Sequence, residues 1–219
     1  AQQSPRGGNI MNLAEVLLRP LVSDMTLFLL LLMPAVTMRL FAPEYRSGIW
    51  DMSASWPVAD HAWVLGKWLS ALGTAAILIG LAAAYFLVIA IIGNPEPGPI
   101  LVALLGLVLL SSALAAWGVL ASVLFTHQMV AYFLAFAVSF SLFLVGSLEK
   151  HLPGALGQAC RELSLLSHFE RFSHGVLDSR DILYFAALTG VALLAATAVL
   201  AGRRLPARKR AFLWTPTLL

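Results

Sequence analysis

The five histidines of the chain come first, because imidazole is a common metal ligand and a common general base. They are His61, His127, His151, His168 and His174. No two of them stand four residues apart and no H-E-x-x-H occurs, so their spacing does not predict a zinc site. His168, Glu170 and His174 could approach one another, and we interpret them as ordinary polar residues near a membrane surface.

Other signatures of catalysis or nucleotide binding are missing as well. Lys67 follows a glycine, but the glycine loop and hydroxyl residue of a G-x-x-x-x-G-K-[ST] phosphate site are absent, and no G-x-S-x-G occurs. Cys160 is the only cysteine, so neither an intrachain disulfide nor a cysteine-rich zinc site can form. We therefore expect a chain that is not an enzyme, with no catalytic residue, metal or cofactor of its own.

The composition indicates a membrane protein. Of the 219 residues, 60% are hydrophobic and only 11% are charged, whereas a soluble domain carries about a quarter charged residues. A helix needs about 20 mainly apolar residues to cross the hydrocarbon core. The pattern predicts an all-α fold, a polytopic membrane helix bundle with spans at about 21–41, 62–92, 100–125, 129–148 and 182–202 and a tight turn at 126–128.

The positions of the basic residues predict the orientation. Five of the fourteen Lys and Arg residues lie between Arg203 and Arg210, so we expect the tail, 203–219, in the cytoplasm rather than on nucleic acid. Segments 1–20 and 149–181 then lie outside, and 42–60 lies inside. Because nothing in 1–20 would carry it across a membrane, we expect a further span upstream of Ala1 and six spans in the natural chain.

Two outer segments have amphipathic patterns and predict surface helices. In 12–21, an Asn and a Glu three residues apart resemble a capping box ahead of an apolar face. The second segment carries an apolar stripe formed by Leu163, Leu166, Phe169, Phe172 and Val176. Such a stripe usually packs on neighbouring helices or lipid, and its functional alternative is an outer gate over a translocation path.

The ionisable residues of the spans lie near their ends, at Asp24, Arg39 and Lys67, where long side chains reach water. An ion-coupled carrier would be expected to hold an acid or base at mid-depth, and none is found there. Small residues form one face of the third span, which predicts close packing within the chain or contact with a second subunit. These residues are Ser111, Ala115, Gly118 and Ser122.

The segment between the first two spans is short, charged and aromatic. Pro43 and Glu44 suit the first turn of a helix, which we expect to run to about Ser53 across the membrane surface. Tryptophans at 50, 56 and 63 could anchor it in the headgroups. Alternatively, a helix fixed to a span at each end docks in another protein and transmits a push.

Three separated stretches resemble the permeases of ABC type-2 transporters, and most closely the gliding-motility-type permease family. They are MRLFAPEYRSGIWDMSASWPVADHAWVLGKW (38–68), GNPEPGPI (93–100) and LSLLSHFERFSHGVLDSRDILYF (163–185), and the similarity extends over about residues 12–203. The resemblance implies a single transmembrane permease domain over 1–219, in a bacterial inner membrane, and a coupling helix that seats in a separate ATPase subunit. The expected contact residues are Glu44, Arg46, Ser47, Gly48, Trp50 and Asp51.

The resemblance also implies the activity and the partners. We expect an exporter subunit that couples ATP hydrolysis by an ATPase dimer, which holds ATP and Mg²⁺, to export of a lipid-like or large substrate. A second permease copy, an accessory protein outside the cytoplasm and the bilayer complete the expected partners, and Leu166, Phe169 and Phe172 are the outer-gate candidates. The alternative function is mechanical transmission, in which an external partner is driven and no substrate crosses.

Overall fold

The computed structural model describes residues 6–93, 97–148, 154–173 and 175–204. Within these ranges every regular element is an α-helix, as the sequence predicts. The helices are α1 (Arg6–Thr37), α2 (Ala42–Ser47), α3 (Ile49–Ala54), α4 (Asp60–Gly93), α5 (Pro97–Leu124), α6 (Gln128–Leu148), α7 (Ala155–Leu163), α8 (Leu165–Ser173) and α9 (Ser179–Arg204).

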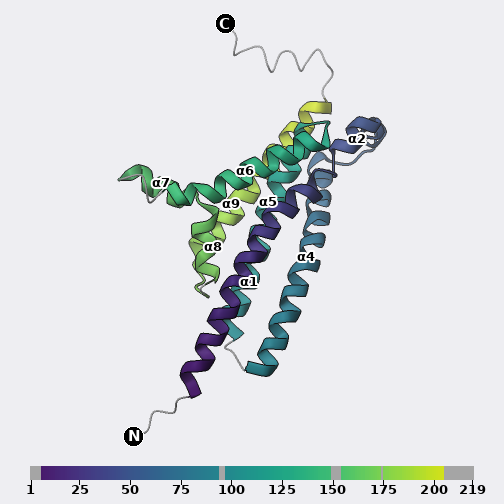
Figure 1. The fold of residues 1–219 in the computed structure, drawn as a ribbon. Coiled ribbons are helices and arrows are strands. Elements are labelled where there is room, and N and C mark those ends of the chain that lie inside the picture. Colours follow the sequence, from purple (N-terminus) through teal and green to yellow (C-terminus); the bar gives the residue numbers. More distant parts are fainter. Residues whose placement is uncertain (1–5, 94–96, 149–153, 174, 205–219) are drawn as a thin grey trace.

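Five helical stretches are long and apolar enough to cross a membrane, which confirms the predicted multi-pass bundle. They are Pro20–Ser47, Asp60–Val88, Gly98–Leu124, Gln128–Gly146 and Ser179–Arg203. The predicted turn between the third and fourth spans is confirmed too, because α5 ends at Leu124 and α6 begins at Gln128. In Figure 1, α2 lies at one end of the long helices, which we call the α2 end. The last turn of α4 and the first turn of α5 lie at the opposite end, which we call the far end.

Helix α5 forms the centre of the bundle. It contacts α1, α4, α6, α8 and α9, and more of its apolar window is buried than that of any other described span. Its residues are hydrophobic on all sides, as expected for a helix surrounded by others. Leu107, Leu110, Leu114 and Val119 are each no more than 1% exposed.

Glycines on α5 and α6 allow neighbouring chain segments to approach closely. A Cβ on Gly118 would lie 2.0 Å from Thr37 Oγ1 of α1, and one on Gly106 would lie 2.6 Å from Phe172 Cβ of α8. On α6, a Cβ on Gly146 would lie 2.2 Å from Ser164 Oγ. Small residues at these positions let the backbones pack without a side chain between them.

Of the two expectations about the amphipathic segments, one was wrong and the other was confirmed in part. Residues 12–21 form no separate surface helix, since α1 is continuous from Arg6 to Thr37 and includes Pro20. A proline removes one backbone N–H donor from the helix. Transmembrane helices tolerate this, because neighbouring groups can satisfy the carbonyl that loses its partner. In the other segment the predicted helices form, as α7 and α8. The predicted stripe is interrupted, because extended backbone at Ser164 separates the two helices and Leu163 and Val176 are exposed.

Candidate functional site: the α2–α3 segment

Residues 42–54, which we call the α2–α3 segment, form two short helices rather than the single helix predicted to run from Pro43 to about Ser53. Gly48 separates them with a φ of 72°, in the left-handed region, where glycine has no Cβ penalty. The helix start was predicted correctly, with a proline and Glu44 in the first turn of α2. The segment is therefore a bent surface element.

Lys67 of α4 links this segment to the end of α1. Its Nζ lies 2.5 Å from Glu44 Oε1 and donates a hydrogen bond to the carbonyl of Leu40. It also lies 4.1 Å from the centre of the Phe41 ring. Carbonyls just beyond a helix C-terminus lack intrahelical partners and attract cations. The side chain of Lys67 is only 14% exposed, so it joins α1, α2 and α4 rather than extending into water.

Ser122 of α5 provides the second link. The residue before α2, Phe41, offers no side-chain cap to the helix. Instead, Ser122 Oγ accepts hydrogen bonds from the backbone N–H of Phe41 at 3.0 Å and of Ala42 at 3.2 Å, and donates to the Met38 carbonyl at 3.4 Å. A hydroxyl at this position satisfies backbone donors, as an N-cap does, but it comes from another helix.

Arg203 near the end of α9 provides the third link. Its Nη2 donates a 2.8 Å hydrogen bond to the carbonyl of Leu124, the last residue of α5. Its guanidinium carbon lies 4.4 Å from the centre of the Tyr45 ring of α2, a cation–π contact. Arg203 thereby joins α2, α5 and α9.

Aromatic side chains form the interior of the α2–α3 segment. The Trp50 ring centre lies 5.5 Å from Tyr45, 5.7 Å from Phe41 and 6.0 Å from Trp63, each in an edge-to-face arrangement. This geometry is favourable for aromatic pairs. Trp50 is only 6% exposed, so it contacts its own chain rather than headgroups or a partner.

The opposite side of the segment is open. Arg46 and Ser47 are exposed, and Ile49, Met52 and Trp56 are 55%, 73% and 60% exposed. Ile49 and Met52 lie on α3, and Trp56 lies in the turn that follows it. Exposed large apolar side chains this close together, beside a charged residue, are unusual. We call Arg46, Ile49, Met52 and Trp56 the exposed set.

The six predicted contact residues therefore have different surroundings. Arg46, Ser47 and Gly48 are exposed, Glu44 is held by Lys67, and Trp50 is buried. The side chain of Asp51 lies outside the described residues. Sequence reasoning missed Ile49 and Met52, although their three-residue spacing on α3 is a recognisable helical pattern.

The sequence also left the links of Lys67, Ser122 and Arg203 unrecognised. A lysine near the start of an apolar span, close to a Pro-Glu helix start, was a signal for the Lys67 link.

The four small residues of the third span, Ser111, Ala115, Gly118 and Ser122, lie buried inside the chain's own bundle. They thus pack span against span within one chain.

The outer-gate candidates lie at the far end. Phe169 and Phe172 are 3% and 0% exposed and Leu166 is half-buried. Phe172 packs against Gly106, and its ring centre lies 6.1 Å from that of Phe185. These residues fix α8 against α5 and α9.

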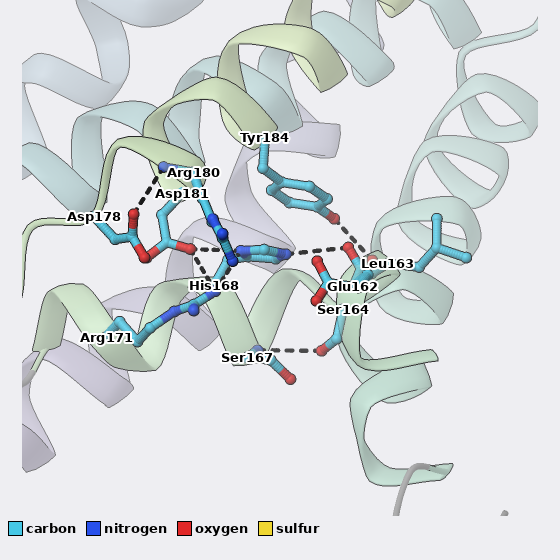
Figure 2. A network of polar contacts seen from close by, with 10 residues as sticks. All are labelled: Glu162, Leu163, Ser164, Ser167, His168, Arg171, Asp178, Arg180, Asp181 and Tyr184. Atoms are coloured by element: carbon cyan, nitrogen blue, oxygen red, sulfur yellow. Dashed lines mark hydrogen bonds and ion pairs between the residues drawn. The ribbon is translucent and has the colours of Figure 1, made fainter. Parts of the chain in front are cut away.

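The interpretation of His168 as an ordinary surface residue was wrong. It is 4% exposed and lies 2.6 Å from Asp181, which is fully buried (Figure 2). Glu170 is exposed, and His174 lies outside the described residues. Across the described part of the chain, no three His, Cys, Asp or Glu side chains gather as a metal site would require.

Comparison of the chain with protein-family models, curated proteins and solved structures finds no match. The geometry of the α2–α3 segment and its sequence resemblance therefore carry the functional argument.

Proposed function

We propose that this chain is the membrane subunit of an ABC type-2 exporter and that the α2–α3 segment receives a separate ATPase subunit. The observation that supports this is the two-sided character of the segment. One side is tied to α4, α5 and α9 through Lys67, Ser122 and Arg203. The other side exposes apolar residues and a cation.

The proposed mechanism follows from these links. Closure of the ATPase dimer on ATP displaces the α2–α3 segment, and the partly buried ion pair of Lys67 with Glu44 passes the displacement to α4. Ser122 passes it to α5, and Arg203 to α9. A segment joined to three spans in this way moves them together, because packed cores shift between discrete arrangements rather than deforming gradually.

The partners and orientation belong to the same proposal. The α2 end faces the cytoplasm, the ATPase subunits supply ATP and Mg²⁺, and a second permease copy completes the pathway. A lipid-like substrate accords with spans whose charged residues lie near the ends, among them Asp24, Arg39, Lys67, Asp181 and Arg203. Apolar walls impose no desolvation cost on an apolar substrate.

The test separates docking from coupling with two variants of the native assembly. Met52→Asp places a charge in the exposed set, and we expect the ATPase subunit to be lost when the permease is purified. Lys67→Gln leaves the exposed set intact, so the ATPase should stay bound while the permease no longer alters its hydrolysis rate. Arg39→Gln, an exposed basic residue at the same end, is the control.

Each outcome bears on the proposal. Loss of the ATPase from Met52→Asp but not from Arg39→Gln supports docking at the exposed set. If no ATP-hydrolysing subunit accompanies the wild-type chain, or if Met52→Asp leaves association and stimulation unchanged, the proposal is contradicted.

Mechanical transmission is the second candidate. The same charge distribution is compatible with it, because spans that hold no charged residue at mid-depth also suit a chain through which no substrate passes. Structures of the native assembly with and without ATP distinguish the two. Lipid density in a continuous cavity between permeases supports export. A closed permease interface that moves an external partner supports transmission.

A further inference from the structure

The two helices of the α2–α3 segment are too short to be stable by themselves. Helices α2 and α3 have six residues each, whereas isolated helices shorter than about 12–15 residues are marginal in water. The residues at their N-caps are Phe41 and Gly48, and neither has a side chain that can accept a hydrogen bond. The order of the segment therefore depends on contacts with the rest of the chain.

The backbone donors at the start of α2 are satisfied by one atom of α5. The first N–H groups of a helix have no intrahelical acceptor, and Phe41 and Ala42 are both 0% exposed, so water does not reach them. Ser122 Oγ accepts both N–H groups, at 3.0 Å and 3.2 Å. Pro43, which follows, has no N–H to satisfy. Without the hydroxyl, two buried donors would lose their acceptor, which is costly.

The same hydroxyl also holds the end of α1. It donates to the carbonyl of Met38, the first residue after α1, at 3.4 Å. One turn earlier on the same face of α5, Gly118 leaves room for Thr37, the last residue of α1. This face of α5 therefore fixes the corner at which the chain leaves α1 and enters α2.

Lys67 and Arg203 tie the segment to the bundle in a different way. Lys67 pairs with the Glu44 carboxylate and bonds to the Leu40 carbonyl. Arg203 lies over the Tyr45 ring. These contacts do not involve the hydroxyl of α5, so they keep the segment attached without it. A Lys or Arg side chain cannot accept a hydrogen bond, however, so neither residue can satisfy the N–H groups that begin α2. Loss of the hydroxyl should loosen the start of α2 and leave its attachment intact.

We propose that Ser122 is the positioning residue of the α2–α3 segment: its hydroxyl pre-forms the start of α2 and thereby holds the exposed set in one orientation before the ATPase subunit binds. This role rests on the proposed function, which it deepens. An ordered segment loses less conformational entropy on binding than a loose one, so the partner binds more tightly. By reciprocity, a bound ATPase subunit strengthens the contact between α2 and the hydroxyl.

Ser122→Ala removes the hydroxyl, and Ser111→Ala is the matched control. Ser111 lies on the same helix and is 1% exposed, but its hydroxyl donates to the Val108 carbonyl of α5 itself at 2.9 Å. Both variants therefore lose a buried hydroxyl from α5, and only Ser122→Ala loses a contact with α2. Ser122→Thr, which keeps a hydroxyl at this position, should recover most of what Ser122→Ala loses.

Amide hydrogen exchange of the full chain in lipid nanodiscs, measured by NMR, reports the start of α2 without any partner. In Ser122→Ala we expect the Phe41 and Ala42 amides to exchange about tenfold faster, the order of effect of losing an N-cap. The Ala131 amide is the reference, because it bonds to the His127 carbonyl at 3.1 Å at the start of α6. Its exchange should stay at the wild-type rate in both alanine variants.

Association is measured with the ATPase subunit recovered from the native assembly. Each variant chain in nanodiscs is titrated with that subunit, and the Kd is compared with the wild-type value. We expect Ser122→Ala to raise the Kd roughly 3- to 30-fold, because the start of α2 must then be ordered on binding. Ser111→Ala should leave the Kd unchanged.

The outcomes distinguish this role from the proposed function. Recovery of no ATPase subunit contradicts the proposed function and the docking part of the role with it, while amide exchange still reports whether Ser122 pre-forms α2. Unchanged exchange in Ser122→Ala overturns the role, and so does faster exchange with an unchanged Kd. If Ser122→Ala does not fold, the wild-type chain decides: Phe41 and Ala42 amides that exchange faster than the Ala131 amide overturn the role.

Discussion

At the residue scale, Lys67 and Trp50 show how a buried environment changes the role of a side chain. A lysine near the end of a span usually extends to water, but Lys67 meets the Leu40 carbonyl, Glu44 and the Phe41 ring instead. Trp50 lies among three aromatic rings rather than in the headgroups. The contacts of Lys67 and of Trp50 join residues that are far apart in the sequence or that lie beyond a helix break. Only Lys67 has a local signal, its place near the start of an apolar span.

We predict that Lys67→Gln destabilises the folded chain by about 1.5–3 kcal/mol, the usual worth of a hydrogen bond to a charged group. The change leaves Glu44 without its cation. Reversible unfolding in mixed micelles would measure the free energy. Glu44→Gln combined with Lys67→Gln should cost less than the two single changes added together, and strict additivity would show that the pair does not interact.

Trp50→Ala should cost about 3–5 kcal/mol of unfolding free energy, because a large buried aromatic leaves a cavity. Trp56→Ala is the matched control. Trp56 is 60% exposed, so its truncation should change stability by no more than about 0.5 kcal/mol. Equal costs for the two variants would contradict the placement of Trp50.

At the element scale, the long helices could be predicted from composition, and their arrangement could not. Runs of about 20 apolar residues predicted five spans, and each lies within a few residues of the predicted range. The breaks at Gly48 and Ser164 escaped prediction, because one glycine or one extended serine does not alter helical spacing visibly. The central position of α5 depends on which helix faces pack against one another. A helix as uniformly apolar as α5 has no periodic pattern from which those contacts could be predicted.

The close contact of α1 with α5 makes a prediction at this scale. Gly118→Ala places a Cβ 2.0 Å from Thr37 Oγ1, whose hydroxyl donates to the Met33 carbonyl. We expect a loss of about 1–3 kcal/mol from overpacking, measured by unfolding. Gly73→Ala is the control, since no atom lies within 4 Å of its added Cβ and alanine favours helix there. A similar effect of both substitutions would exclude the close approach.

At the scale of the whole molecule, α5 connects the two ends. It carries Ser122, which caps α2, and Gly106, on which α8 rests. These residues are separated by about 24 Å along the helix, at 1.5 Å per residue. Helix α5 is therefore in direct contact with both the start of α2 and α8. The start of the helix at Pro43 and Glu44 could be predicted from the sequence, whereas the partners of Glu44 and Trp50 required the folded chain.

The central claim is that the exposed set receives an ATPase, and one measurement tests it most directly. A photoreactive benzoylphenylalanine replaces Met52, which is 73% exposed at the α2 end, or Leu183, which is 71% exposed at the start of α9. Illumination of the native membrane is followed by identification of the attached protein. The account predicts an adduct with an ATP-hydrolysing subunit from position 52 and none from position 183. An assembly that contains the ATPase but gives no such adduct at 52, or gives it at 183, would contradict the account.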